Sequence, residues 1–215
     1  MVRTPYGPFT RRAFAGLLLG AVALPACAQP RRPVVTLLGD SITAGYGLPA
    51  RDALPARLQA ELARRVPGVV VRGAGVSGDT TAGGLARVNF SVQNDTSLCV
   101  VALGGNDLLQ GKDPKVIRAN LDGILKALAA RRIPAVLAGI AIPSALGRSY
   151  AREVAAVYAD LAARHRAPLY PNLLAGVGGD RRLNQRDGIH PNAAGVNIIA
   201  ARLAPVVAGA LKTRR

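Results

Sequence analysis

The sequence VVTLLGDSIT, residues 34–43, joins a short apolar run to a Gly-Asp-Ser turn, and this junction decides the expected fold. Residues 34–38 have the length and composition of a buried β-strand. Gly39-Asp40-Ser41 then forms a tight strand-to-helix turn. A strand that is apolar on both faces is typical of a parallel sheet covered by helices on both sides, so we expect an α/β fold.

Outward from this junction, strand and helix patterns alternate along the chain. Further strands are expected at 69–71, at 98–103, within 134–142 and, with a weaker signal, at 169–170. Helices are expected near 52–66, at 79–89, from Asp113-Pro114 onward, near 149–164 and from Pro191 onward. This alternation predicts one three-layer α/β/α domain built on a five-stranded parallel sheet.

In such a sheet, ligands bind beyond the carboxyl ends of the strands. The loop after the first strand contains Ser41, whose hydroxyl is expected at the edge of the sheet. The Ser41 backbone N–H should lie near a helix N-terminus, which favours negative charge. Because Asp and Ser also cap helices well, this segment alone fits an ordinary helix cap equally well.

A second segment, Asp187-Gly188-Ile189-His190-Pro191, places a carboxylate three residues before an imidazole. A serine hydroxyl is a poor nucleophile at neutral pH and needs a base. His190 can accept the serine proton and return it to a leaving group, and Asp187 can orient the ring. The other histidine, His165, lies in a basic helix end, where we expect a structural role.

Two glycine-rich loops contain candidate donors for an oxyanion. Asn106, in Gly104-Gly105-Asn106-Asp107, can donate its side-chain amide to a tetrahedral intermediate, and Gly78 can donate an unobstructed backbone N–H. Each such donor is worth about 3 kcal/mol of barrier. Either loop by itself is also typical of a plain glycine-rich turn.

Together and in this order, the four segments resemble the SGNH (GDSL-like) hydrolase family, over nearly all of the chain after residue 28. The matching blocks are 39–45, Gly78, 104–107 and 187–191. The resemblance implies a flavodoxin-like SGNH hydrolase fold with no metal and no cofactor. It also implies Ser41 as nucleophile, His190 as base and Asp187 as its orienting partner, with an oxyanion hole formed by Ser41, Gly78 and Asn106.

Within that family the chain is most similar to the periplasmic multifunctional subgroup of acyl-CoA thioesterases, arylesterases and lysophospholipases. This implies a serine esterase that hydrolyses small to medium acyl esters and thioesters through an acyl-serine intermediate. We expect Leu108, Leu109, Ile142 and Pro143 to contact the substrate. The chain departs from the subgroup pattern after the fourth strand, where Ala141, Ala145 and Leu146 replace an arginine, an asparagine and a tyrosine.

Two other functions remain open. A carbohydrate O-deacetylase of the same family would use the same residues, but the chain lacks long aromatic insertions for stacking on sugars. A non-catalytic ligand-binding α/β module would need a phosphate-binding loop. No Gly-x-Gly-x-x-Gly or Gly-x-x-x-x-Gly-Lys-Ser/Thr segment follows a strand in this sequence.

The N-terminal residues predict export. Arg11 and Arg12 precede an apolar run at 13–24 that is short for a membrane span. We expect a signal peptide at 1–28, resembling the twin-arginine type, and a hydrolase domain at 29–215 that is periplasmic or secreted. Alternatively, Leu24-Pro25-Ala26-Cys27 resembles a lipoprotein box that would anchor the protein through Cys27.

The formal charge of +16 suggests anionic partners in general, but the arginines are scattered mostly as pairs and aromatic residues make up only 4%. We therefore expect a solvated basic surface, no specific nucleic-acid binding and at most weak association with membranes. The expected partner is a small acyl ester or thioester, with a lysophospholipid as a further candidate and no obligate protein partner. Cys99 is expected to be an inert core thiol.

Overall fold

The computed structural model describes residue 1, residues 32–140 and residues 147–213. It contains a five-stranded sheet in the order β2-β1-β3-β4-β5, in which every neighbouring pair is parallel. The strands are β1 (Val34–Gly39), β2 (Val70–Gly75), β3 (Leu98–Ala102), β4 (Ala135–Ala138) and β5 (Leu169–Tyr170). This order is that of flavodoxin-like folds, so the predicted fold class is confirmed.

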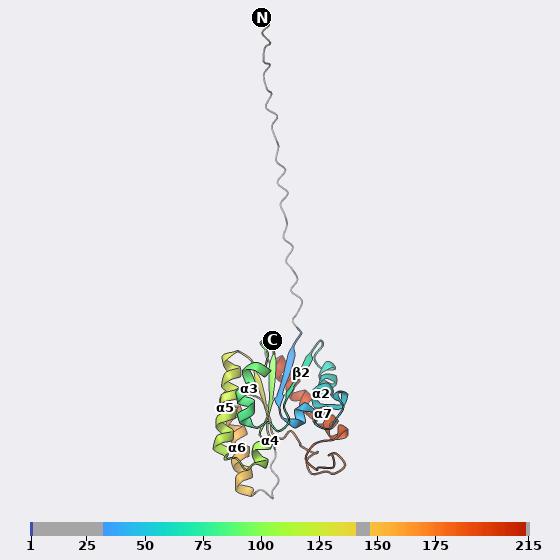
Figure 1. The fold of residues 1–215 in the computed structure, drawn as a ribbon, viewed down its shortest axis with the longest axis vertical. Helices are drawn as coiled ribbons and strands as arrows, with labels where there is room; N and C mark the ends of the chain where they lie inside the picture. Colours follow the sequence, from blue (N-terminus) through green and yellow to red (C-terminus); the bar gives the residue numbers. More distant parts are fainter. Residues whose placement is uncertain (2–31, 141–146, 214–215) are drawn as a thin grey trace. The chain divides into compact units, whose positions relative to one another are not determined.

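Helices cover both faces of the sheet (Figure 1). On one face lie α2 (Leu54–Ala63) and α7 (Ala193–Lys212), and on the other lie α3 (Thr81–Ser91), α5 (Pro114–Ala130) and α6 (Arg148–His165). Two short helices, α1 (Ser41–Ala44) and α4 (Gly105–Leu109), directly follow β1 and the loop after β3. A 3₁₀ turn, η1 (Ala50–Asp52), precedes α2.

The continuous apolar runs of β1 and β3 are explained by the two separate cores. Val35 and Leu37 pack into the core beneath α2 and α7, whereas Leu38 faces the core beneath α3, α5 and α6. All residues of both strands are buried, because side chains that alternate along a strand enter both cores. Cys99 lies in the second core, and burial raises the pKa of its thiol to about 12, as expected for a core thiol.

The last helix differs from its prediction. It begins at Ala193 rather than at Pro191, and Asn192 is its cap, with Oδ1 accepting from the Gly195 N–H at 3.1 Å. Pro191 instead forms an antiparallel bridge with Asn184. The prediction of Pro191 as the helix start was wrong because this proline belongs to the loop that presents His190, and asparagine is the stronger capping residue.

Among the described residues, α7 is also the one helix long and apolar enough to cross a membrane. Half of its most apolar window is buried inside the protein, where it packs on α2. Its apolar character is therefore that of a core helix. Cys27 and all of the predicted signal peptide except residue 1 lie outside the described residues.

Gly75 ends β2 against the turn that presents Ser41. A Cβ at Gly75 would lie 2.3 Å from the Ala44 nitrogen and 2.8 Å from the Asp40 carbonyl oxygen, which are backbone atoms that cannot rotate away. We expect Gly75→Ala to lower the free energy of unfolding by about 1–3 kcal/mol, as measured by urea denaturation.

Gly209→Ala is the matched control, because Gly209 lies inside α7 and the position of its Cβ is open. We expect this control to raise the free energy of unfolding by about 0.5–1 kcal/mol through helix propensity. Equal effects of the two substitutions would contradict a steric role for Gly75.

Candidate active site

Ser41 begins α1 at the carboxyl end of β1. The cap of this helix is Asp40, whose Oδ1 accepts a hydrogen bond from the Ile42 N–H at 3.0 Å. The helix-cap interpretation of the Gly-Asp-Ser segment is thus satisfied by Asp40. The Ser41 hydroxyl is left to bond elsewhere.

That hydroxyl faces His190, which is 149 residues away in the sequence. Ser41 Oγ lies 2.9 Å from His190 Nε2, and His190 Nδ1 lies 2.6 Å from Asp187 Oδ2. Both contacts are within hydrogen-bonding distance, as nucleophilic catalysis by a serine requires. The structure therefore brings together the three residues predicted as a catalytic triad.

Asp187 is fixed by its own loop. Its Oδ1 accepts from the backbone N–H groups of Ile189 at 2.9 Å and His190 at 3.0 Å. The hydrogen bond from the His190 ring, followed by these backbone N–H groups, lowers the pKa of Asp187 to about 2. An ionised Asp187 favours the tautomer of His190 with the proton on Nδ1, which leaves Nε2 free to accept the Ser41 proton.

Two residues that sequence reasoning did not assign to the site hold His190 in place. The Tyr46 ring packs against the imidazole, with the ring centroids 4.6 Å apart. Gln185 donates through Nε2 to the Tyr46 carbonyl at 2.7 Å and through its backbone N–H to the His190 carbonyl at 2.8 Å. Gln185 thereby ties the loop after α1 to the loop that carries the histidine.

Besides the Ser41 N–H at the start of α1, the predicted oxyanion donors are Gly78, after β2, and Asn106, after β3. Gly78 follows β2 with φ +83°, a backbone conformation that favours glycine, and no heavy atom lies within 4 Å of where its Cβ would be. Asn106, in α4, donates through Nδ2 to the Asp79 carbonyl at 2.8 Å. Because a side-chain amide carries two N–H groups, the second one of Asn106 can serve a substrate.

A cavity of about 510 Å³ opens beside the triad. Ser41, His190 and Asn106 line it, together with the predicted contact residues Leu108 and Leu109. Gly78 is not among its lining residues, and the predicted contacts Ile142 and Pro143 lie outside the described residues. Sequence reasoning missed other apolar lining side chains, which are Ile42, Ile140, Leu174 and Ile189.

The glycines of the loop after β5 complete the wall of this cavity, at positions 176, 178 and 179. The run Gly176-Val177-Gly178-Gly179 is visible in the sequence and was the one signal that could have placed this loop at the site. His165 lies elsewhere and pairs with Asp122, with Nε2 2.7 Å from Oδ1, in the structural role predicted for it. Across 32–140 and 147–213, no three His, Cys, Asp or Glu side chains cluster closely enough to hold a metal ion.

Comparisons with known proteins bear on this geometry. The model of the GDSL-like lipase/acylhydrolase family matches residues 37–198. The chain is 38% identical over 177 residues to the esterase TesA of Pseudomonas aeruginosa, covering 81% of this chain and 88% of that protein. It is 36% identical over 157 residues to thioesterase 1/protease 1/lysophospholipase L1 of Escherichia coli, covering 73% and 74%.

Solved structures share the fold. The crystal structure of AlinE4, an SGNH-hydrolase family esterase, matches with a TM-score of 0.70 at 41% identity, over 85% of this chain and 98% of that one.

The Asp40 carboxyl should make the stability of the folded protein depend on pH. Burial raises the pKa of this carboxyl from 3.8 to about 6, against the opposing hydrogen bond from the Ile42 N–H. The folded protein therefore holds this proton more tightly than the unfolded chain does, so stability falls as the pH rises from about 4 to about 6. Asn at position 40 keeps the capping oxygen but cannot titrate.

The measurement is the free energy of unfolding in urea at pH 4 and at pH 7. On going from pH 4 to pH 7, we expect this free energy to fall by about 2 kcal/mol more in wild type than in Asp40→Asn. Asp180→Asn is the control for an exposed carboxylate, since Arg182 lowers the pKa of Asp180 from 3.8 to about 2, so that most of its titration falls below this window and its effect on stability has the opposite sign. A difference between wild type and Asp40→Asn that does not change with pH would contradict the burial effect.

Proposed function

Because the chain belongs to the GDSL-like lipase/acylhydrolase family, we propose that it hydrolyses carboxylic esters and thioesters by passing the acyl group first to Ser41 and then to water. The observation that carries this proposal is the hydrogen-bonded series from Ser41 Oγ through the His190 ring to Asp187, with links of 2.9 Å and 2.6 Å.

In the acylation step, Ser41 Oγ attacks the carbonyl carbon of the substrate while His190 Nε2 accepts the hydroxyl proton. The Asp187 carboxylate stabilises the imidazolium that forms. The negative charge on the substrate oxygen is met by the N–H groups of Ser41, Gly78 and Asn106. When the intermediate collapses, His190 returns the proton to the departing alkoxide or thiolate, and the acyl group stays on Ser41.

Deacylation repeats these steps with water as the nucleophile. His190 Nε2 takes a proton from the water molecule as its oxygen attacks the acyl carbon, and the same N–H groups stabilise the second oxyanion. The proton then passes from His190 to Ser41 Oγ, and the carboxylic acid leaves. Every step uses side-chain and backbone groups of this chain.

The cavity supports a small or medium acyl group as the preferred substrate. Ile42, Leu108 and Leu174 give part of its wall an apolar character that suits a hydrocarbon chain. Leu109 also lines it and is 64% exposed, so the cavity is open to solvent on that side. We include lysophospholipids among the candidate substrates, and the net charge of +16 supports weak attraction to anionic lipid surfaces.

For localisation we propose export directed by residues 1–28, with function in the periplasm or outside the cell. Support comes from the arginines before the apolar run at 13–24. Lipid attachment at Cys27 remains the alternative. A mature N-terminus after residue 28, determined on protein purified from the periplasm, would distinguish cleavage from lipidation.

Ser41→Ala tests the proposal directly. We expect kcat/KM for 4-nitrophenyl butyrate to fall by at least about 10³-fold, because the variant cannot form the acyl-enzyme. Ser149→Ala is the control, since that hydroxyl lies on α6 and contacts Glu153 at the surface. Unchanged turnover by a folded Ser41→Ala protein would overturn the catalytic assignment and favour a binding module.

A substrate panel separates the esterase from the carbohydrate deacetylase. We expect kcat/KM for an aryl butyrate and a medium-chain acyl thioester to exceed the value for acetylated xylan by at least about tenfold, because no aromatic residue lines the described cavity for sugar stacking. Rates should be compared at equal concentrations of acyl groups. A preference for the glycan would reverse this order.

A further inference from the structure

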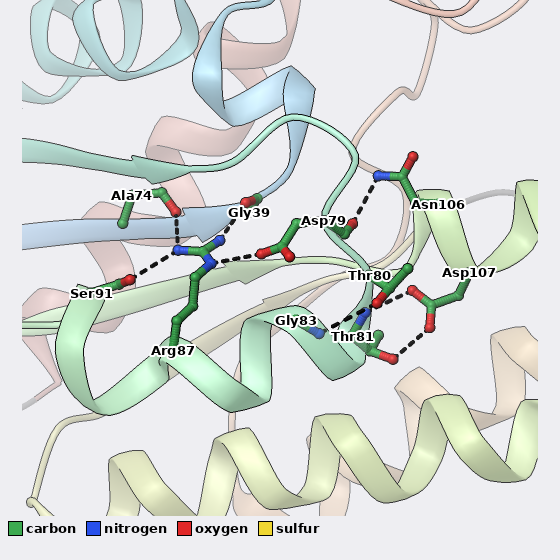
Figure 2. A network of polar contacts seen from close by, with 10 residues as sticks. All are labelled: Gly39, Ala74, Asp79, Thr80, Thr81, Gly83, Arg87, Ser91, Asn106 and Asp107. Carbon is green, nitrogen blue, oxygen red and sulfur yellow. Dashed lines mark hydrogen bonds and ion pairs between the residues drawn. The ribbon is translucent and has the colours of Figure 1, made fainter.

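Arg87 lies on α3, outside the cavity, yet its guanidinium contacts the ends of β1 and β2 and the loop that follows β2 (Figure 2). Nη2 donates to the Gly39 carbonyl at 2.8 Å, and Nη1 donates to the Ala74 carbonyl at 2.8 Å. Gly39 is the last residue of β1 and stands two residues before Ser41. Ala74 lies near the end of β2, just before the loop that contains Gly78.

The same guanidinium also forms an ion pair with Asp79, the residue after Gly78. Arg87 Nε donates to Asp79 Oδ2 at 2.6 Å, and the two side chains are only 18% and 13% exposed, so water competes little for the pair. A Cβ on Gly83 would lie 1.9 Å from Asp79 Oδ1. Glycine at 83 therefore gives the carboxylate room to lie against the first turn of α3.

Asp79 in turn holds Asn106. Its backbone carbonyl accepts from Asn106 Nδ2 at 2.8 Å, which fixes the orientation of the amide. One N–H of the amide is used in this bond. The second points in a different direction, because the group is planar, and is the one available to a substrate oxygen. Asp79 thus contacts one proposed oxyanion donor, Asn106, through its carbonyl and directly follows a second, Gly78, in the chain.

We propose that Arg87 is a positioning residue that sets the geometry of the oxyanion hole, an inference that rests on the proposed function. The donors at Ser41, Gly78 and Asn106 belong to three separate segments, after β1, after β2 and after β3. Arg87 contacts the first two segments directly and reaches Asn106 through Asp79. One rigid group therefore links all three donors.

Arginine suits this task and lysine does not. The guanidinium is a planar fork whose donors point in fixed directions, and here it bonds Gly39, Ala74 and Asp79 at once. A lysine ammonium keeps the charge, and so the attraction to Asp79, but it is a single point on a flexible stem. Arg87→Lys therefore preserves the ion pair while it loosens the strand ends.

The experiment compares Arg87→Lys with Arg131→Lys. Arg131 also donates to a backbone carbonyl, that of Val92, and to Asn94 Oδ1 at 2.9 Å, but it caps the end of α5 and does not contact the segments that carry the donors. With an aryl butyrate as substrate, we expect Arg87→Lys to lower kcat by about 10- to 100-fold, with KM within about threefold of wild type. Arg131→Lys should leave both constants within about twofold.

A double-mutant cycle with Asn106→Ala separates positioning from general stability. If Arg87 acts through the oxyanion donors, Arg87→Lys should cost only about threefold in kcat once Asn106 is removed, because residues that act as a unit are not additive. If Arg87→Lys fails to fold, Asp79→Asn takes its place in the same double-mutant cycle with Asn106→Ala. Asp79→Asn weakens the contact with Arg87 but keeps the backbone carbonyl that Asn106 uses.

An unchanged kcat in Arg87→Lys would overturn the inference. So would a fold-loss in kcat from Arg87→Lys that is as large in the Asn106→Ala background as in wild type. Ser41→Ala, measured in the same assay, distinguishes a failure of the Arg87 inference from a failure of the proposed function. If Ser41→Ala is inactive while Arg87→Lys keeps the wild-type kcat, the positioning role alone is wrong. If wild type has no ester turnover, or Ser41→Ala retains it, the proposed function itself is wrong.

Discussion

The hydrogen bond of 2.9 Å between Ser41 Oγ and His190 Nε2 is the contact on which the account depends, because it joins segments 149 residues apart. The sheet makes this contact achievable. β1 lies between β2 and β3, where the strand order reverses, and the carboxyl ends of parallel strands share one edge. Ser41, Gly78 and Asn106 follow these three strands, and the loop before α7 brings His190 to the same edge. The fold thus supplies proximity, and local hydrogen bonds supply orientation.

Two carboxylates near this contact have opposite environments. Hydrogen bonds from His190 and the backbone lower the pKa of Asp187 to about 2, whereas burial raises the pKa of Asp40 to about 6. Asp187 is therefore ionised wherever His190 is needed as a base. Asp40 borders the cavity next to Ser41, so its negative charge at neutral pH opposes the charge that develops on the substrate oxygen. The N–H donors must overcome this repulsion, so their positions matter. The proposed role of Arg87 is to fix those positions.

The sequence predicted what depends on local pattern. The apolar runs of β1 and β3 indicated strands buried on both faces, and the three-residue spacing of Asp187 and His190 indicated a pair that the structure joins within one loop. Contacts across the fold could not be found in this way. Gln185 reaches Tyr46 over 139 residues, and no local pattern distinguishes it from a surface glutamine. Arg87 belongs to a segment, Gly84-Leu85-Ala86-Arg87, that supported the family resemblance, but no pattern in the sequence assigned it a role, and only its contacts with Gly39 and Ala74 reveal its place. The proposed contacts at Ile142 and Pro143 remain predictions.

The central claim is that the acyl group passes through Ser41. A fluorophosphonate reagent tests this most directly, because it reacts with an activated serine and leaves a stable adduct that peptide mass spectrometry can locate. We expect one phosphonyl group per chain, on the peptide that contains Ser41, and loss of ester hydrolysis in proportion to labelling. Full hydrolysis by protein that is completely labelled at Ser41, or inactivation that accompanies labelling at another residue, would contradict it.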